Sequence, residues 1–224
     1  MAIVVNTNVT SINAQRNLYS STQNLNKSME KLSSGLRINR ASDDAAGLSI
    51  ADGLKGQIRG LKQSERNAQD GISLIQVAEG AMGQQANMLT RMRELATQSA
   101  NGALNTTQRS AIDTEFKALQ TEIDRIANTS DFNGNNVVGS NAAAVTLQIG
   151  FGGAAKKLNN TMVISAQTST ASGLSVHSGQ VGVGTVASAQ SAISAISAAI
   201  NSLSDKRGIM GAKQNRLDYA VSNL

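Results

Sequence analysis

Few side chains in this sequence have a type and spacing that could support catalysis. The one histidine, His177, lies in a Ser/Gly-rich stretch without a nearby carboxylate, so it fits a loop residue better than a general base. Asp43 and Asp44 are adjacent and would point from different faces of a helix, where they suit its first turn through the helix dipole. The other acidic residues are scattered, without a metal-binding constellation. The residues predict no enzyme, no cofactor and no metal.

Other features exclude further classes of site. The absence of cysteine rules out disulfides, thiolate metal sites and cysteine nucleophiles. The fragment Gly182-Val183-Gly184 lacks the third glycine and the preceding strand of a phosphate loop, so it predicts a flexible turn. A net charge of +5 raises nucleic acid as a partner. However, the basic residues are dispersed among acidic ones and only 2% of residues are aromatic, which argues against nucleic acid.

The N-terminus carries no targeting signal that can be recognised. Residues 1–5 lack a basic leader and an apolar core, and no later run approaches the ~18 apolar residues of a membrane span. We therefore expect no cleaved signal, no membrane partner and, if the protein leaves the cell, a dedicated export route.

The chain is organised around one long proline-free stretch, Asp44 to Asn101. Apolar residues recur there every seventh position, and a second series interleaves with them. This pattern predicts a single helix with a narrow apolar seam, which requires other helices for its burial. The first series is Leu54, Leu61, Ala68, Ile75, Met82, Leu89 and Ala96, and the second is Ala51, Ile58, Glu65, Ile72, Glu79, Ala86 and Arg93.

Three further segments have helical periodicity. The first runs from about Ala14 to Leu36, with Leu18, Leu25, Met29, Leu32 and Leu36 as its stripe; Gly35 can end it, and Ser42 or Asp43 can cap the long helix. The second, of about 20–24 residues, follows an Asn105 cap and must fold back antiparallel. Its stripe is Ile112, Phe116, Leu119, Ile123 and Ile126. The third covers residues 186–224 with steps of three and four, and predicts a long partner for the central seam.

Between about residues 131 and 184 the period changes to that of strands. Residues 145–150 and 161–166 alternate, with glycine and asparagine turns between them, and a Ser/Gly-rich connection follows from Ser169 to Gly184. The predicted fold is mainly α: an elongated antiparallel bundle of long, coiled-coil-like helices with a small β-hairpin region.

Several stretches resemble bacterial flagellins. The segment from Leu32 to Ile50 is similar to their N-terminal signature, as are residues 1–8, 91–101, 122–127, 132–134 and 211–217. The resemblance covers about 1–140 and 185–224. It implies a secreted, extracellular structural subunit that self-assembles into the flagellar filament for motility, with cap proteins, junction proteins and the flagellar export apparatus as partners.

The resemblance also implies a domain organisation. Residues 1–43 would be the N-terminal segment of the inner, filament-core domain, and residues 44–224 the outer-tube helical domain, with a variable β/loop region at about 131–184. Flagellins normally continue past Asn215-Arg216 into a further helix. We therefore expect a short form without large outer domains and without the C-terminal helix. The alternative within the same group is a flagellin-related hook–filament junction protein.

One recognition site follows from the resemblance. In flagellins recognised by Toll-like receptor 5, an arginine and a leucine on one helix and a glutamate on the antiparallel helix form the contact surface. Arg91, Leu95 and Glu115 occupy those positions, beside Leu89, Gln98 and Ile112. An apolar spot rimmed by charges suits an interface. The competing interpretation is an Arg91–Glu115 surface pair with Leu95 facing a neighbouring subunit.

Overall fold

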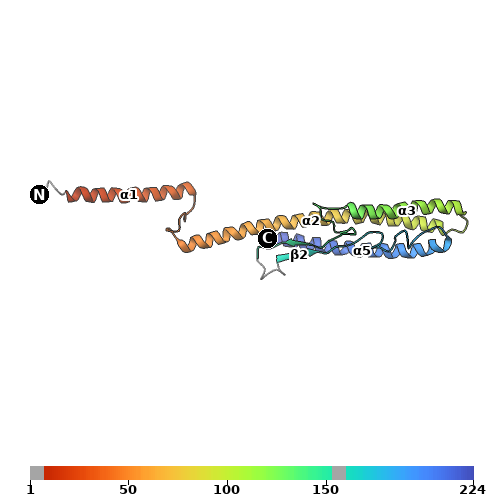
Figure 1. Ribbon diagram of the computed structural model, residues 1–224. Coiled ribbons are helices and arrows are strands. Elements are labelled where there is room, and N and C mark those ends of the chain that lie inside the picture. Colours follow the sequence, from red (N-terminus) through yellow and green to blue (C-terminus); the bar gives the residue numbers. More distant parts are fainter. Residues whose placement is uncertain (1–7, 153–159) are drawn as a thin grey trace. The chain divides into compact units, whose positions relative to one another are not determined.

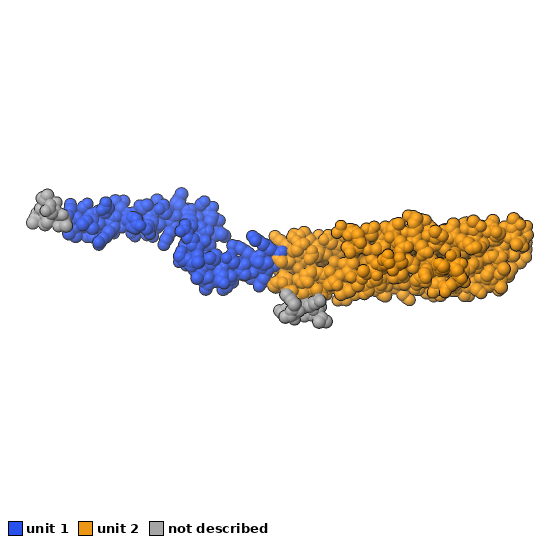
Figure 2. All heavy atoms as spheres, viewed as in Figure 1, with its two compact units in different colours: residues 1–59 blue, residues 60–224 orange. Residues whose placement is uncertain are grey.

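The computed structural model describes residues 8–152 and 160–224, so residues 1–7 of the expected N-terminal segment lie outside the described part. The described chain contains four α-helices and one two-stranded sheet. It divides into two compact units, residues 1–59 and 60–224 (Figure 2). No helix of the described residues is apolar enough over a sufficient length to cross a membrane.

Unit 1 contains α1, Val9–Ser34, which begins five residues earlier than expected. Asn8 caps it by accepting a hydrogen bond from Ser11 N at 3.2 Å, and Gly35 ends it in the left-handed conformation at φ 66°. No residue of α1 is buried. Its apolar stripe therefore faces solvent throughout.

The long helix α2, Ala45–Ser99, has the predicted bounds to within two residues. Its cap differs from the prediction of Ser42 or Asp43: Asp44 Oδ1 accepts a hydrogen bond from Gly47 N at 2.9 Å. Asp43 instead accepts hydrogen bonds from the backbone N–H groups of Asn39 and Arg40, which lower the pKa of its carboxyl. Asp43 therefore stabilises the turn before α2, and Asp44 caps the helix.

In unit 2, α3 (Thr106–Thr129) and α5 (Val186–Asn223) run alongside α2 (Figure 1). Asn105 caps α3 with the expected side chain, in a reciprocal capping box with Gln108. Three apolar residues of the α3 stripe are buried, but Leu119 and Ile126 are only partly so. Gln120 and Ala127 take their places in the interior. The predicted mainly α bundle with a small hairpin is confirmed.

The buried face of α2 contains the first predicted heptad series but not the second. The first heptad series is buried from Ala68 to Ala96, as expected. Another heptad series is buried as well, and apart from Met92 it consists of small or polar residues: Ser64, Gly71, Ala78, Gln85, Met92 and Ser99. Small side chains serve here because neighbouring segments approach the helix closely. The second predicted series is only partly buried: Ile72 and Ala86 pack against the core, whereas Arg93 faces solvent. This agrees with a seam narrowed by the charged residues of that series.

Helix α5 supplies the long partner for that seam. Its heptad series Ala189, Ile196, Leu203, Met210 and Leu217 is buried throughout. The expectation of a chain without a C-terminal helix is wrong: α5, with 38 residues, closes the described chain. The periodicity of residues 186–224 predicts this helix, but the comparison with flagellins that continue past Asn215-Arg216 led to the expectation that the C-terminal helix is missing.

The hairpin pairs β1, Val145–Gln148, with β2, Thr161–Ile164, in antiparallel register. Leu147 lies opposite Met162. The side chain of Leu147 rests in the space left by Gly71 on α2, and Asn67 Nδ2 donates to Gln148 O at 2.9 Å. The predicted hairpin is confirmed. The hairpin can lie close to α2 because Gly71 has no side chain.

The sequence predicts a Ser/Gly-rich connection from Ser169 to Gly184, with a flexible turn at residues 182–184. Residues 167–183, called the strap below, pack into the core instead, and Val183 of the predicted turn is buried. Ala171, Leu174, Val176, Val181 and Val183 are buried in the core. Polar side chains hold the main chain of the strap. Asp113 and Asp124 accept from Val183 N and Ala171 N, Gln120 Nε2 donates to Val176 O and Val181 O, and Lys206 Nζ donates to Thr168 O. Burial lowers the pKa of Lys206.

We expect Asp113 to make the strap sensitive to acid. Partial burial acts to raise the pKa of its carboxyl, but hydrogen bonds from Lys117 and from Val183 N outweigh burial and place the pKa below its usual value. A lowered folded-state pKa gives stability that is present above the unfolded value of about 3.9 and is lost as the pH falls through the folded value. Urea unfolding of wild type and Asp113→Asn should therefore differ at neutral pH and converge in strong acid. In the matched control Asp70→Asn, which changes an exposed carboxylate, the free energy of unfolding should stay close to that of wild type at both pH values.

Candidate recognition surface

The predicted receptor residues come from two antiparallel helices that meet at the α2–α3 turn. Arg91 on α2 lies beside Glu115 on α3: Nε and Nη2 of Arg91 donate to Glu115 Oε1 at 3.0 and 2.9 Å. Nη1 donates to Glu94 Oε2 at 3.1 Å, one turn along α2. The two carboxylates raise the pKa of the Arg91 guanidinium, Glu115 first. All three side chains are about half exposed or more, so the triad is available to a partner.

The apolar residues of the same prediction lie underneath the triad. Leu89, Leu95 and Ile112 are buried, with 0%, 1% and 9% of their surface exposed. Their burial means that they support the surface and do not offer an apolar spot to a partner. It also argues against the competing interpretation in which Leu95 faces a neighbouring subunit. Spacing alone did not reveal this, because α2 is covered on two sides by helices.

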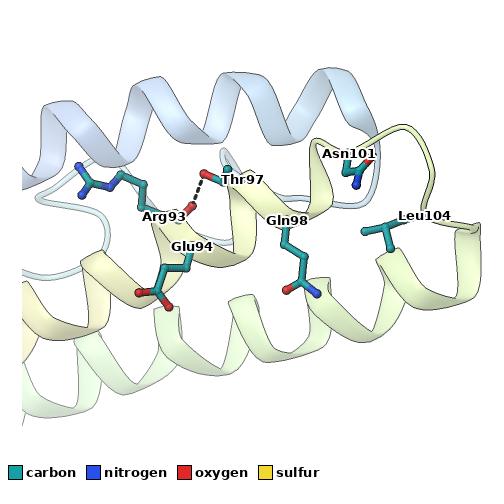
Figure 3. A pocket seen from close by; sticks show the side chains of 6 residues that line it. All are labelled: Arg93, Glu94, Thr97, Gln98, Asn101 and Leu104. Atoms are coloured by element: carbon teal, nitrogen blue, oxygen red, sulfur yellow. Dashed lines mark hydrogen bonds between the residues drawn. The ribbon is translucent and has the colours of Figure 1, made fainter.

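Gln98, the remaining predicted residue, is exposed and lines a shallow groove of about 600 Å³ (Figure 3). In the close view, the side chains of Glu94 and Gln98 extend toward α3, while Asn101 and Leu104 stand at the turn. The groove is lined by Arg93, Glu94, Thr97, Gln98, Asn101 and Leu104. Five of the six lining residues carry polar or charged side chains, so the groove offers hydrogen-bond partners to a ligand.

The sequence pattern did not predict two further residues, Glu94 of this surface and Arg109 beside it. Glu94 lies three residues after Arg91, the spacing at which opposite charges meet on a helix, so it could have been found. Arg109 had no such signal. It reaches back from the first turn of α3, and its guanidinium donates to Ser99 O at 3.0 Å and to Asn101 O at 2.9 Å. Ser99 O belongs to the last turn of α2, where carbonyls lack intrahelical partners, and Asn101 O lies in the turn that follows. Arg109 therefore caps the end of α2 and holds the turn.

The second predicted set is the stripe of α1. Leu18, Leu25, Met29 and Leu32 are 59–78% exposed, and Leu36 follows the end of the helix at 49%. An amphipathic helix with nothing on its apolar face is not stable by its own propensity. Within the described residues, this is the largest run of apolar side chains that lacks packing partners.

The two surfaces define the class of protein. The described residues hold no cluster of acidic or histidine side chains that could bind a metal, and the chain presents an unpacked helix together with a polar helical face. An exposed apolar stripe of this length is typical of a surface that another protein chain covers.

Comparison with known proteins gives the family. Residues 5–142 match the model of the bacterial flagellin N-terminal helical region. A flagellin of Halalkalibacterium halodurans is 41% identical over 224 residues, covering 99% of this chain and 80% of its own. The crystal structure of Bacillus cereus flagellin superposes with a TM-score of 0.61 at 33% identity, over 71% of this chain and 89% of that one. This chain belongs to the bacterial flagellin family.

Other relatives qualify that similarity. Flagellin A of Vibrio anguillarum and a flagellin of Clostridium tyrobutyricum are 51% and 56% identical over 67% and 58% of this chain, but the matches span only 40% and 35% of those longer proteins. A putative flagellar hook-associated protein of Vibrio parahaemolyticus has a TM-score of 0.65 at 18% identity, over 82% of this chain and 93% of its own, and so shares the fold alone. Flagellin membership makes the chain a structural, non-enzymatic subunit of the extracellular flagellar filament.

Proposed function

We propose that α1 is the segment through which copies of this chain associate in the filament. The observation that carries the proposal is the unburied stripe, because heptad-spaced leucines gain stability only when another helix covers them. In this proposal residues 1–43 belong to the filament core and residues 44–224 to the outer helical domain. Cap proteins, junction proteins and the export apparatus are partners that the family membership suggests.

We expect the triple variant Leu18→Ser, Leu25→Ser, Leu32→Ser to lose polymerisation. The matched control Asn17→Ser, Asn24→Ser, Lys31→Ser changes the neighbouring face and should polymerise like wild type. Sedimentation and electron microscopy measure assembly, and urea unfolding of the monomer checks that unit 2 keeps its stability. Polymerisation of the leucine variant, or none by the wild-type chain, contradicts the proposal.

We further propose that the surface of Arg91, Glu115 and Gln98 is recognised by Toll-like receptor 5. The support is the exposure of these side chains and the fixed geometry of the Arg91–Glu115 pair. A half-exposed arginine held by carboxylates on two sides loses little conformational freedom on binding, which favours it as an interface anchor. The buried leucines contribute by positioning α2.

Arg91→Ala should weaken receptor activation. In reporter cells, the protein concentration that gives the half-maximal response should rise by about tenfold or more. The control is Arg125→Ala, which removes another exposed arginine of an ion pair, Arg125–Glu122. Leu95→Ala is unsuitable as a contact test because its side chain is buried. Equal potency of Arg91→Ala and wild type would discard the receptor site while leaving the assembly proposal intact.

A further inference from the structure

We propose that the Asn101–Gly102 peptide in the α2–α3 turn is a site of spontaneous deamidation, promoted by the groups around it. The product would be an aspartyl or isoaspartyl residue at position 101. The chain contains two Asn-Gly pairs, Asn101–Gly102 and Asn133–Gly134, and the structure treats them in opposite ways. The second pair therefore serves as a control within the same molecule.

The reaction needs only water. The Gly102 N–H gives its proton to solvent, and its nitrogen attacks the side-chain carbonyl carbon Cγ of Asn101. The new C–N bond gives a tetrahedral intermediate, whose side-chain nitrogen takes up a proton from water. The bond between Cγ and that nitrogen then breaks, ammonia leaves, and a five-membered succinimide remains. Water then opens the ring at either carbonyl, without any change in oxidation state. Opening at the Cγ carbonyl yields the aspartyl product, and opening at the main-chain carbonyl yields the isoaspartyl product.

The first requirement is a nucleophilic nitrogen. Gly102 N has no hydrogen-bond partner within the described residues, and Gly102 is exposed, so solvent base can reach the proton. Removal of that proton places negative charge on the peptide, shared with Asn101 O. This oxygen already accepts hydrogen bonds from Arg109 Nη2 at 2.9 Å and from Leu104 N at 3.3 Å. A fixed guanidinium beside the anion lowers the cost of forming it.

The second requirement is stabilisation of the attacked carbonyl. Asn101 Oδ1 accepts a hydrogen bond from Ala103 N at 3.1 Å, which restrains the side chain within the turn that contains the Gly102 peptide. In the tetrahedral intermediate this oxygen carries the developing negative charge, so a donor is already in place for it. Glycine at 102 adds no Cβ to obstruct the ring, and nothing lies within 4 Å of where a Cβ would be.

The pair Asn133–Gly134 has the reverse arrangement. Gly134 N donates its proton to Asp131 Oδ2 at 3.0 Å, so the proton is held by a carboxylate. The same carboxylate would repel the anion that the attack requires. Asn133 and Gly134 are also fixed in the left-handed region, at φ 51° and 76°, by a tight turn closed by the Phe132–Asn135 bridge. We therefore expect this pair to react slowly in the folded protein.

Deamidation would change the recognition surface. Asn101 lines the same groove as Gln98 and Glu94, so the product adds a negative charge there. The isoaspartyl form also inserts a methylene into the main chain of the turn that Arg109 holds. An aged filament protein would thus carry a chemically different α2–α3 turn from a new one.

The test follows both sites in the intact chain during incubation in mildly alkaline buffer. Proteolytic peptides containing residues 101 and 133 are quantified by mass spectrometry, and isoaspartate is confirmed by enzymatic methylation. Folded protein should react several-fold faster at Asn101 than at Asn133, and the two rates should converge in chain unfolded with urea. Arg109→Gln should slow the reaction at Asn101 alone, and Asp131→Asn should accelerate it at Asn133.

Thermal unfolding establishes that each variant is folded. If Arg109→Gln does not fold, Gly102→Ala replaces it, since its added methyl slows the attack and meets no other atom. Equal rates at the two sites in folded wild type overturn the proposal. A rate at Asn101 that a folded Arg109→Gln or Gly102→Ala protein leaves unchanged or raises overturns it as well.

Discussion

Replacing Phe116 with alanine is expected to destabilise unit 2 by about 3–5 kcal/mol. Phe116 is the only aromatic side chain that is fully buried within the described residues. The residues of the surrounding core are almost all aliphatic, alanine or methionine, and they cannot close around the cavity that the ring would leave. For a domain with a typical stability of roughly 5–15 kcal/mol, this loss would put folding itself at risk.

Urea unfolding of monomeric protein, followed by circular dichroism, measures the effect of Phe116→Ala. The matched control is Phe151→Ala, the same substitution at a ring that is 55% exposed, which should cost less than about 1 kcal/mol. Similar losses in the two variants would show that burial of Phe116 does not dominate the stability of this core.

A leucine at Gly71 is expected to destabilise the same unit by about 1–3 kcal/mol, although leucine favours helices. A Cβ at this position would clash with Leu147 Cδ1 of the hairpin and would lie 3.3 Å from Leu217 Cδ1 of α5. The larger side chain must displace the hairpin from α2. The cost of that displacement exceeds the gain in helix propensity.

Gly80, nine residues further along α2, is the control for Gly71→Leu. Nothing lies within 4 Å of a Cβ built there, so Gly80→Leu should stabilise the monomer by roughly 0.5–1 kcal/mol. The two changes are chemically identical and lie in one helix, yet their effects on the free energy of unfolding should have opposite signs. A shift in the same direction for both would remove the close-approach explanation for Gly71.

The helices could be predicted from the sequence because heptad spacing is a property of neighbours along the chain. The bounds of α2 and the capping of α3 by Asn105 followed from such local signals. The second seam of α2 did not, because Ser64, Gly71 and Gln85 look like solvent-facing residues. They are buried for tertiary reasons: Gly71 makes room for the hairpin, and Gln85 Nε2 donates to Ile123 O of α3 at 3.2 Å.

The candidate recognition surface could also be predicted only in part. The Arg91–Glu115 surface pair, which belongs to the competing interpretation of this site, is present in the structure. The burial of Leu95 could not be predicted, because periodicity does not say how many faces of a helix other segments cover. Arg109 was missed for a related reason: a side chain that caps the preceding helix across a turn leaves no repeat in the sequence.

The strap is fastened by its peptide groups. Asp113, Gln120, Asp124 and Lys206 hold main-chain N–H and C=O groups, which are the same whatever side chains the segment carries. Its outward residues, such as Ser172, Ser178 and Gln180, can therefore be exchanged freely while the attachment persists. Such a segment can change the chemistry of its exposed surface through substitution without any change in the helices beneath.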